Sequence, residues 1–201
     1  MPAIALAVYV AFFAVAFGWR MWLQYRRTGD TGFRGFSGRT GLAGLVGSVS
    51  LVLAATLPGV AAIAAGLGAA PTLAAVNTAA ASRIGLGLAL FGFVIVIVSQ
   101  LQMRDSWRVG LDRRETTALV TTGLFSLMRN PIYTGSFLAI AGVFLMVPNA
   151  LSAAALVLIL PGLEIQVRQV EEPYLLQTHG DTYRAYARRV GRFIPWLGRL
   201  A

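Results

Sequence analysis

The stretch TALVTTGLFSLMRNPIYTG, Thr117–Gly135, leads into a helix start that decides how the second half of the chain folds. Pro131 suits the first position of a helix, because its missing N–H is harmless there and its φ is already helical. Asn130 then takes the capping position, where its side chain can accept a free backbone N–H. Such a helix start attracts a carboxylate or phosphate through its free N–H groups and the positive end of the helix dipole. On these residues alone, an anion site and an ordinary loop-to-helix junction are equally open.

The composition of the whole chain identifies the class of protein. Of the 201 residues, 57% are hydrophobic and 12% are charged, whereas a soluble domain carries about 25% charged residues. The low charge and the long apolar runs predict an all-α integral membrane protein. Cysteine is absent, which excludes a disulfide framework, a thiolate nucleophile and a cysteine-based metal site. The single His179 argues against a histidine cluster, so no metal is expected.

Five apolar segments are expected to cross the bilayer as helices. They are residues 3–23, 41–65, 84–102, 131–147 and 150–167. The fourth segment measures about 25 Å as a helix, barely the thickness of the hydrocarbon core. The Pro148-Asn149 turn joins it to the fifth, so these two segments form a helical hairpin. The Gly- and Ala-rich connection at 66–82 separates an N-terminal part, residues 1–82, from a core at 83–201.

The arginines predict the orientation in the membrane. All 17 basic residues are Arg, and all but Arg83 follow the first, third or fifth apolar segment. Because basic residues near span ends stay in the cytoplasm, the N-terminus is expected outside and the C-terminal tail inside. The net charge of +9 then reflects this topology and anionic lipid headgroups, not nucleic acid. The Ala- and Arg-rich, Lys-free composition indicates a GC-rich bacterium, so the inner (plasma) membrane is the expected location.

The tail after the hairpin carries an unusual density of polar residues. It contains Glu171, Glu172 and six arginines. One interpretation is an amphipathic helix that lies on the lipid headgroups. Glu164 either pairs with Arg168, one turn later on the same helix face, or faces a cavity.

Taken together, these segments resemble the isoprenylcysteine carboxyl methyltransferase family and its phospholipid methyltransferase relatives. The family pattern is Leu-Val-x-x-Gly with a following aromatic residue, Arg-His-Pro-x-Tyr, a helical hairpin, Glu-Glu-x-x-Leu, Gly-x-x-Tyr-x-x-Tyr and Arg-Phe-x-Pro. The matching runs here are Leu119–Phe125, Arg129–Tyr133, Glu171–Leu175, Gly180–Tyr186 and Arg192–Pro195. The resemblance covers roughly residues 100–196, in the family's order, while the first two spans match only as generic membrane helices.

The resemblance implies a methyltransferase that uses S-adenosylmethionine and a membrane-embedded or amphipathic acceptor, which is a carboxylate, an amine or a thiol. It implies a cytoplasmic cofactor pocket between the loop before the fourth span and the tail. The residues implied to contact the cofactor are Thr117, Ala118, Leu119, Val120, Phe125, Asn130, Pro131, Ile132, Tyr133 and Glu171. The cofactor's carboxylate is expected at the start of the Pro131 helix or on Arg129.

Two positions depart from the family pattern. The family's His is Asn130 here, which hydrogen-bonds but cannot titrate. At the position of the family's substrate-facing Arg this chain has Val167, so the next residue, Arg168, is the nearest candidate for that role. Arg168 and Glu171 are the expected catalytic residues. Methyl transfer is a displacement at an already activated sulfonium carbon, so alignment and exclusion of water matter more than a strong base.

Two other functions stay open. A small transporter or channel is disfavoured, because five spans give no even inverted repeat and no span carries a run of ionisable residues. A non-catalytic membrane scaffold that retains the fold is not excluded by the fold. The expected partners are membrane lipids and a lipid-like or small amphipathic acceptor, without nucleic acid, and the oligomeric state is left open.

Overall fold

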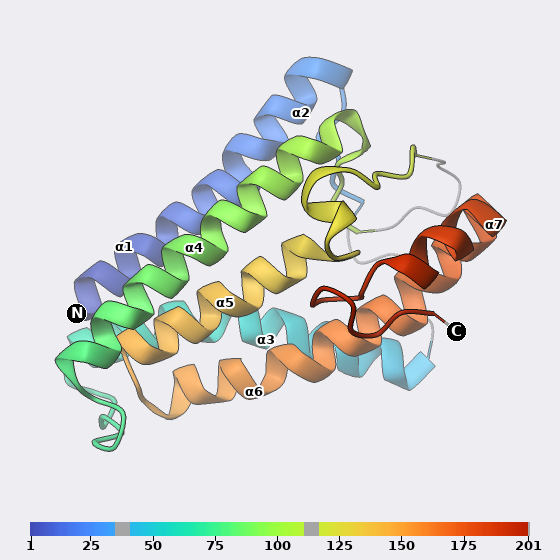
Figure 1. The fold of residues 1–201 in the computed structure, drawn as a ribbon. Coiled ribbons are helices and arrows are strands. Elements are labelled where there is room, and N and C mark those ends of the chain that lie inside the picture. Colours follow the sequence, from blue (N-terminus) through green and yellow to red (C-terminus); the bar gives the residue numbers. More distant parts are fainter. Residues whose placement is uncertain (35–40, 111–116, 201) are drawn as a thin grey trace.

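A computed structural model describes residues 1–34, 41–110 and 117–200, and helices dominate these residues (Figure 1). In chain order they are α1 (Pro2–Phe13), α2 (Arg20–Thr28), α3 (Gly41–Gly66), α4 (Ala79–Met103), α5 (Pro131–Met146), α6 (Ala150–Ile165) and α7 (Glu172–Arg189). Wide π-helical turns, Ala14–Trp19 and Gln166–Glu171, join α1 to α2 and α6 to α7, and short 3-10 turns lie at Arg104–Ser106 and Gly123–Ser126. Residues 35–40 and 111–116, in the connections that follow the first and third expected spans, lie outside the described residues.

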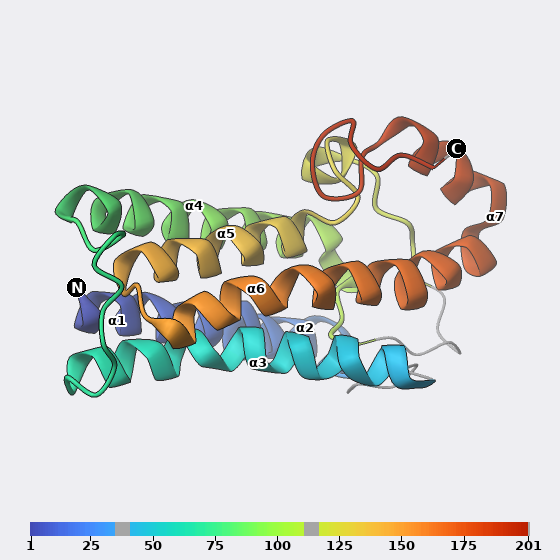
Figure 2. The ribbon, with the colours of Figure 1, turned by 90° about the horizontal axis from the view of Figure 1, so that it is seen from below.

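The helices confirm the all-α membrane class. Four helical segments are long and apolar enough to cross a bilayer, namely Pro2–Thr28, Gly44–Gly66, Ala79–Ser106 and the one that begins at Ala150. The fifth predicted span, α5, is a shorter apolar helix of 16 residues, so the count of five crossings stays a prediction. Figures 1 and 2 show α1 and α3–α6 running along one common direction, as a membrane bundle does.

Glycines set the distance between α4 and α5. A Cβ atom at Gly92 would lie 2.4 Å from the Gly135 carbonyl oxygen, and one at Gly142 would lie 2.5 Å from the Ala89 nitrogen. The two backbones therefore touch, which is how small residues let membrane helices approach. Gly87, on the same helix as Gly92, has nothing within 4 Å of its Cβ position and faces away.

The predicted turn between α5 and α6 is confirmed. The Asn149 side chain accepts hydrogen bonds from the backbone nitrogens of Leu151 and Ser152 and so caps α6. Its amide also donates to the Ala61 carbonyl on α3, at 3.1 Å. One Asn thus ends the connection, begins the next helix and ties the hairpin to α3.

A buried arginine links α2 to the end of α4. The Arg20 side chain is fully buried and donates to the Arg104 carbonyl at 2.5 Å and to the Gln24 side chain at 2.9 Å. Its guanidinium lies 4.6 Å from the centre of the Trp107 ring. Arg104 has a φ of +49°, so α4 ends at a bend that Arg20 stabilises by binding the freed carbonyl. This contact positions the chain that leads toward the candidate site.

Candidate active site

The loop before α5 and the C-terminal segment lie side by side, as the sequence analysis predicts. The backbone nitrogen of Arg129 donates to the Gly191 carbonyl at 2.8 Å, and that of Asn130 donates to the Arg192 carbonyl at 3.0 Å. Thr134, in the first turn of α5, donates from its hydroxyl to the Phe193 carbonyl at 2.7 Å. Figure 1 shows the resulting arrangement, in which the tail turns back from α7 to the start of α5.

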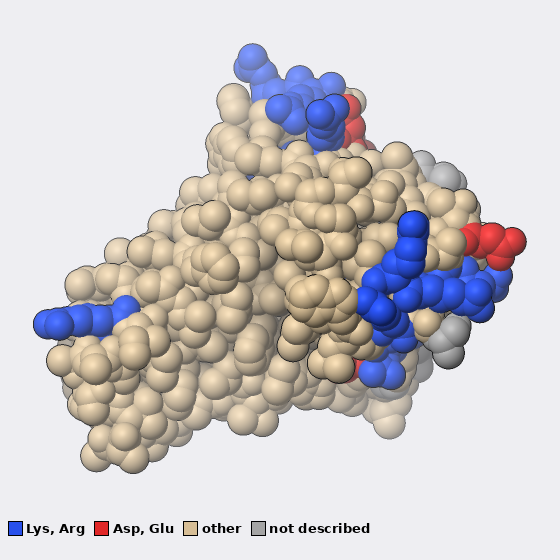
Figure 3. Space-filling model, viewed as in Figure 1, with Lys and Arg blue, Asp and Glu red and all other residues tan. Residues whose placement is uncertain are grey.

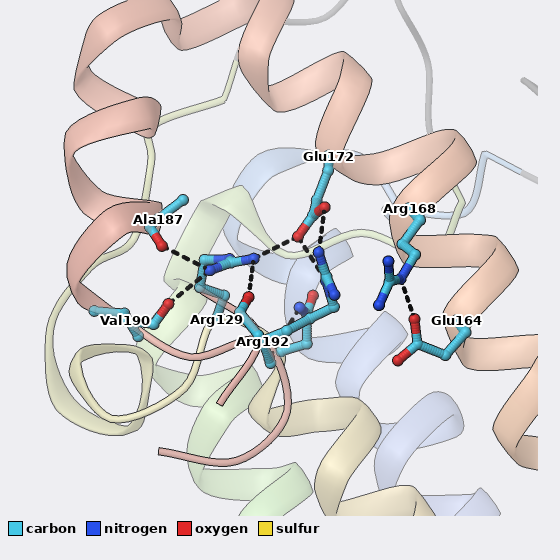
Figure 4. Close-up of polar contacts among 9 residues, drawn as sticks. Arg129, Glu164, Arg168, Glu172, Ala187, Val190 and Arg192 are labelled. Carbon is cyan, nitrogen blue, oxygen red and sulfur yellow. Dashed lines mark hydrogen bonds and ion pairs between the residues drawn. The ribbon is translucent and has the colours of Figure 1, made fainter. Parts of the chain in front are cut away.

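A buried Arg–Glu–Arg cluster, Arg129, Glu172 and Arg192, holds this arrangement together (Figure 4). Glu172 accepts from Arg129 at 2.5 Å and from Arg192 at 2.9 and 3.0 Å. Arg129 also donates to the carbonyls of Ala187 at 2.9 Å and Val190 at 2.6 Å, where α7 ends. The cluster therefore pairs the Glu172 carboxylate with two guanidiniums, which leaves one positive charge in excess, and it binds the tail at several points.

The ion pairing in this cluster shifts the pKa values of its members. Burial acts to raise the pKa of Glu172, but the hydrogen bonds from Arg192 and Arg129 outweigh it, so the pKa lies below its ordinary value. The hydrogen bond to Glu172 in turn raises the pKa of Arg192. Both groups lie beyond the membrane-spanning α6, and they are ionised together at neutral pH.

Glu171, the adjacent residue, has a different environment. Its carboxylate accepts from the Tyr133 hydroxyl and from the Gln166 side-chain amide, at 3.2 Å for the latter. Both donors are neutral, and burial raises the pKa of Glu171 above its ordinary value. A carboxylate whose hydrogen-bond partners are neutral retains its attraction for a cationic ligand. The π-helical turn Gln166–Glu171 places the two acids against different partners, and π-helical turns are frequent at functional sites.

The structure groups most of the predicted cofactor residues at this place. Leu119 packs against the buried Tyr183 and Tyr186 of α7. The carbonyl of the buried Phe125 accepts from the Tyr186 hydroxyl at 2.6 Å. Arg129, Asn130, Pro131, Ile132 and Tyr133 follow at the start of α5, and Val120 is half-buried.

Thr117 lies at a different place. Its hydroxyl accepts from Arg108 at 2.5 Å. It lines a cavity of about 210 Å³ with residues of α2 and of the chain after α4, among them Gln24 and Trp107. Ala118, next to it, is exposed. In the described part of the chain, Thr117 and Ala118 are therefore not grouped with Glu171.

Asn130 occupies the predicted capping position, but the predicted side-chain cap is wrong. No side chain caps α5 at this residue, and the Asn130 amide donates to the Arg192 carbonyl at 3.1 Å instead. The carbonyl of the returning tail accepts from the Asn130 amide and so orients the side chain, a contact that local sequence does not reveal. This role requires a hydrogen-bond donor and no titration.

Of the two alternatives for Glu164, the structure shows the pair with Arg168. Arg168 donates to the Glu164 carboxylate one turn earlier, and both side chains are substantially exposed. Figure 4 shows the pair on the helix that carries Glu172, beside the Arg–Glu–Arg cluster. Arg129, expected to bind the cofactor's carboxylate, is instead engaged with Glu172 and the end of α7.

Sequence reasoning missed Glu172 and Arg192 as partners at this site. Both belong to runs that carry the family resemblance, Glu171–Leu175 and Arg192–Pro195, which was the available signal. Their pairing with Arg129 joins positions 43 residues apart along the chain, so no local pattern indicates it.

The phospholipid methyltransferase family matches residues 81–182, half of the chain. Protein-S-isoprenylcysteine O-methyltransferase B of Arabidopsis thaliana is 29% identical over 118 residues, which cover 58% of this chain and 60% of that protein. Methanethiol S-methyltransferase of Crocosphaera subtropica is 32% identical over 118 residues, covering 54% and 45%. This chain thus spans about 60% or less of the length of these curated relatives.

A solved structure matches the fold of the whole chain. It is that of the eukaryotic intramembrane Ras methyltransferase ICMT, with a TM-score of 0.62 and 19% sequence identity, covering 100% of this chain and 70% of that one. The likeness shows that the two proteins share a membrane fold. The family predicted from the sequence is thereby confirmed: this chain belongs to the phospholipid methyltransferase family.

Proposed function

We propose that this chain is an integral membrane methyltransferase that uses S-adenosylmethionine and methylates a lipid-like or amphipathic acceptor. The observation that carries the proposal is Glu171, a half-buried carboxylate that accepts hydrogen bonds from the neutral Tyr133 and Gln166. The adjacent acid, Glu172, is already paired with Arg129 and Arg192. A cationic, water-soluble cofactor needs an acidic group of this kind.

The residues present fit that cofactor. Glu171 is placed to hold its ammonium group or ribose hydroxyls, and Tyr133 and Gln166 keep the carboxylate in position. Asn130 does not cap α5, which leaves the first N–H groups of this helix to other partners, such as the cofactor's carboxylate. When bound, S-adenosylmethionine supplies a methyl group on an activated sulfonium. The chain's own contribution is alignment and the exclusion of water by the returning tail.

The site is proposed to face the cytoplasm of a bacterial cell, with the N-terminus outside. The described arginines of the three Arg-rich segments lie mainly at one end of the bundle, the end that holds the site, and Figure 3 shows long uncharged surfaces between the charged regions. Basic residues near span ends stay in the cytoplasm. A water-soluble cofactor then reaches the site directly.

Replacing Glu171 by Gln is expected to weaken binding of S-adenosylmethionine by about 10- to 100-fold, because a hydrogen bond to a charged group contributes about 1.5–3 kcal/mol. Isothermal titration calorimetry on the purified protein measures this. Glu164→Gln is the matched control, since Glu164 pairs with Arg168 on the exposed side of the same segment. Equal affinity in the parent and Glu171→Gln would contradict the assignment, and no binding by the parent would end the methyltransferase proposal.

Arg168 is proposed to face the acceptor. Its pair with Glu164 is exposed, and such pairs contribute about 0–1 kcal/mol to stability, so Arg168→Ala is expected to leave unfolding unchanged. The expected effect is a raised KM for the acceptor with unchanged affinity for the cofactor. A methyl-transfer screen with labelled cofactor against a lipid extract, small thiols and prenylcysteine analogues identifies the acceptor first. An unchanged KM in the variant would remove Arg168 from the site.

A further inference from the structure

The C-terminal segment ends in a tight turn, Ile194–Leu197, whose apolar side chains point outward. The backbone nitrogen of Leu197 donates to the Ile194 carbonyl at 3.2 Å, which closes the turn, and that of Arg192 donates to the Leu197 carbonyl at 2.8 Å. Despite this ordered backbone, Ile194 is 56% exposed, Trp196 76% and Leu197 66%. Three large apolar side chains are thus presented on one short turn.

The turn keeps its shape at some cost to the backbone. Trp196 has a φ of +65°, a left-handed conformation that costs an L-residue about 1 kcal/mol. A Cβ atom at Gly191 would lie 2.0 Å from the Ile194 carbonyl oxygen, so a glycine is needed where the turn packs back on the chain. A strained residue that the surrounding contacts hold in place indicates a functional constraint on that residue.

Neighbouring contacts place this turn at the depth of the membrane helices. Phe193, directly before it, packs against the cluster formed by Ala54, Ile159 and Leu163. Phe137, which packs against the same cluster, lies six residues inside α5, about 9 Å along the helix. Figures 1 and 2 both show the C-terminal loop on the outside of the bundle beside the first turns of α5. The exposed side chains therefore lie where a surrounding bilayer meets water.

The charges around the turn complement an anionic lipid surface. The exposed arginines of α7 and the C-terminal segment are Arg184, Arg188, Arg189 and Arg199. The one acidic residue described on α7 beyond its first turn is Asp181, which pairs with Arg184. Figure 3 shows basic atoms gathered on this face. Trp near the hydrocarbon boundary and Arg at the headgroups is the usual arrangement at a membrane interface.

We propose that the turn Ile194–Leu197 inserts into the adjacent leaflet and that the surrounding arginines bind anionic phospholipid headgroups. This anchor fixes the tail, and with it Arg192 of the Arg–Glu–Arg cluster, against the start of α5. It is independent of the acceptor and of the methyl-transfer reaction.

The absence of cysteine from the chain makes the test direct. The single variants Ile194→Cys and Leu197→Cys of the full chain are labelled with a nitroxide. They are then reconstituted into nanodiscs of phosphatidylcholine and phosphatidylglycerol. Paramagnetic resonance then compares collisions of the label with oxygen, which concentrates in lipid, and with a water-soluble nickel chelate. The controls are Val157→Cys, which is 69% exposed on the apolar α6, and Asp181→Cys, whose native side chain is 95% exposed.

The labels at 194 and 197 are expected to collide several-fold more with oxygen than with the nickel chelate, as at 157 and unlike 181. In phosphatidylcholine alone, the preference for oxygen is expected to fall. Labels that behave like the one at 181 would overturn the proposal, and a preference unchanged without phosphatidylglycerol would overturn the role of the arginines. If the labels collide rarely with both reagents and the labels of two copies of the chain broaden each other's spectra, the turn contacts a second copy. That outcome would also overturn insertion into the leaflet.

Discussion

Glu172→Gln is expected to release the C-terminal segment from the start of α5 and to abolish cofactor binding. Removing one partner of a buried ion pair costs about 3–5 kcal/mol, because the remaining charge is left without compensation. Here two guanidiniums, of Arg129 and Arg192, lose their shared carboxylate. Calorimetry measures the loss of binding, and limited trypsin digestion measures the release through faster cleavage at the arginines of the tail.

Two comparisons separate this effect from general destabilisation. Glu164→Gln removes an acid from an exposed pair on the same helix and is expected to change neither readout. The double variant Glu172→Gln with Arg192→Gln removes one of the uncompensated charges, so it is expected to lose less stability than the sum of its single changes. Strict additivity, or trypsin resistance equal to the parent in Glu172→Gln, would contradict the cluster's role.

The same cluster predicts a pH dependence with a defined sign. Folding lowers the pKa of Glu172 from its ordinary value of 4.5, so its stabilising contribution is complete above that value. It is lost as the pH falls through the folded-state pKa. Release of the tail is measured by hydrogen exchange near the C-terminus, as protection relative to the intrinsic exchange rate at each pH. This protection is expected to fall in acid in the parent and to be insensitive to this titration in Glu172→Gln.

Gly92→Leu is expected to separate α4 from α5 and unfold the hairpin side of the bundle. The added side chain meets the Gly135 carbonyl and the Ala139 nitrogen, at 2.4 and 2.6 Å from its first atom. Backbone atoms cannot rotate away as a side chain can, so the cost exceeds the ~1–3 kcal/mol of ordinary overpacking. Thermal unfolding in detergent is expected to show a large fall in midpoint.

Gly87→Leu provides the matched control for this prediction. Gly87 lies on the same helix, five residues earlier, and its Cβ position has nothing within 4 Å. The substitution is therefore expected to leave the midpoint unchanged or slightly raised, since Leu favours helix more than Gly does. A similar fall in both variants would mean that helix propensity and not close packing limits the bundle.

The features that the sequence predicts correctly depend on residues a few positions apart. Pro131 at the first position of α5, the Asn149 turn and the pair of Glu164 and Arg168 all belong to this group. Their physical basis is local, because φ preferences, capping groups and one-turn spacing act within a few residues. The close approach through Gly92 was not predicted, because the sequence shows a small residue but not the helix that it faces.

Asn130 shows where local reasoning fails. Its position at the helix start is correctly predicted, yet its amide binds the Arg192 carbonyl and caps nothing. A tail carbonyl that is 62 residues away along the chain accepts from this amide and orients the side chain. The Arg–Glu–Arg cluster holds that part of the tail in place. At this site, predictions about residues a few positions apart are correct, whereas a contact between residues far apart in the sequence is missed.

The sequence by itself determined that this is an all-α membrane protein of the phospholipid methyltransferase family, because apolar length and ordered short motifs are properties of the chain alone. Only the tertiary structure decided that two adjacent acids have different partners. Glu172 meets two arginines from distant segments, whereas Glu171 meets neutral donors. The reason is geometric: the π-helical turn and the returning tail set which carboxylate lies within reach of a guanidinium.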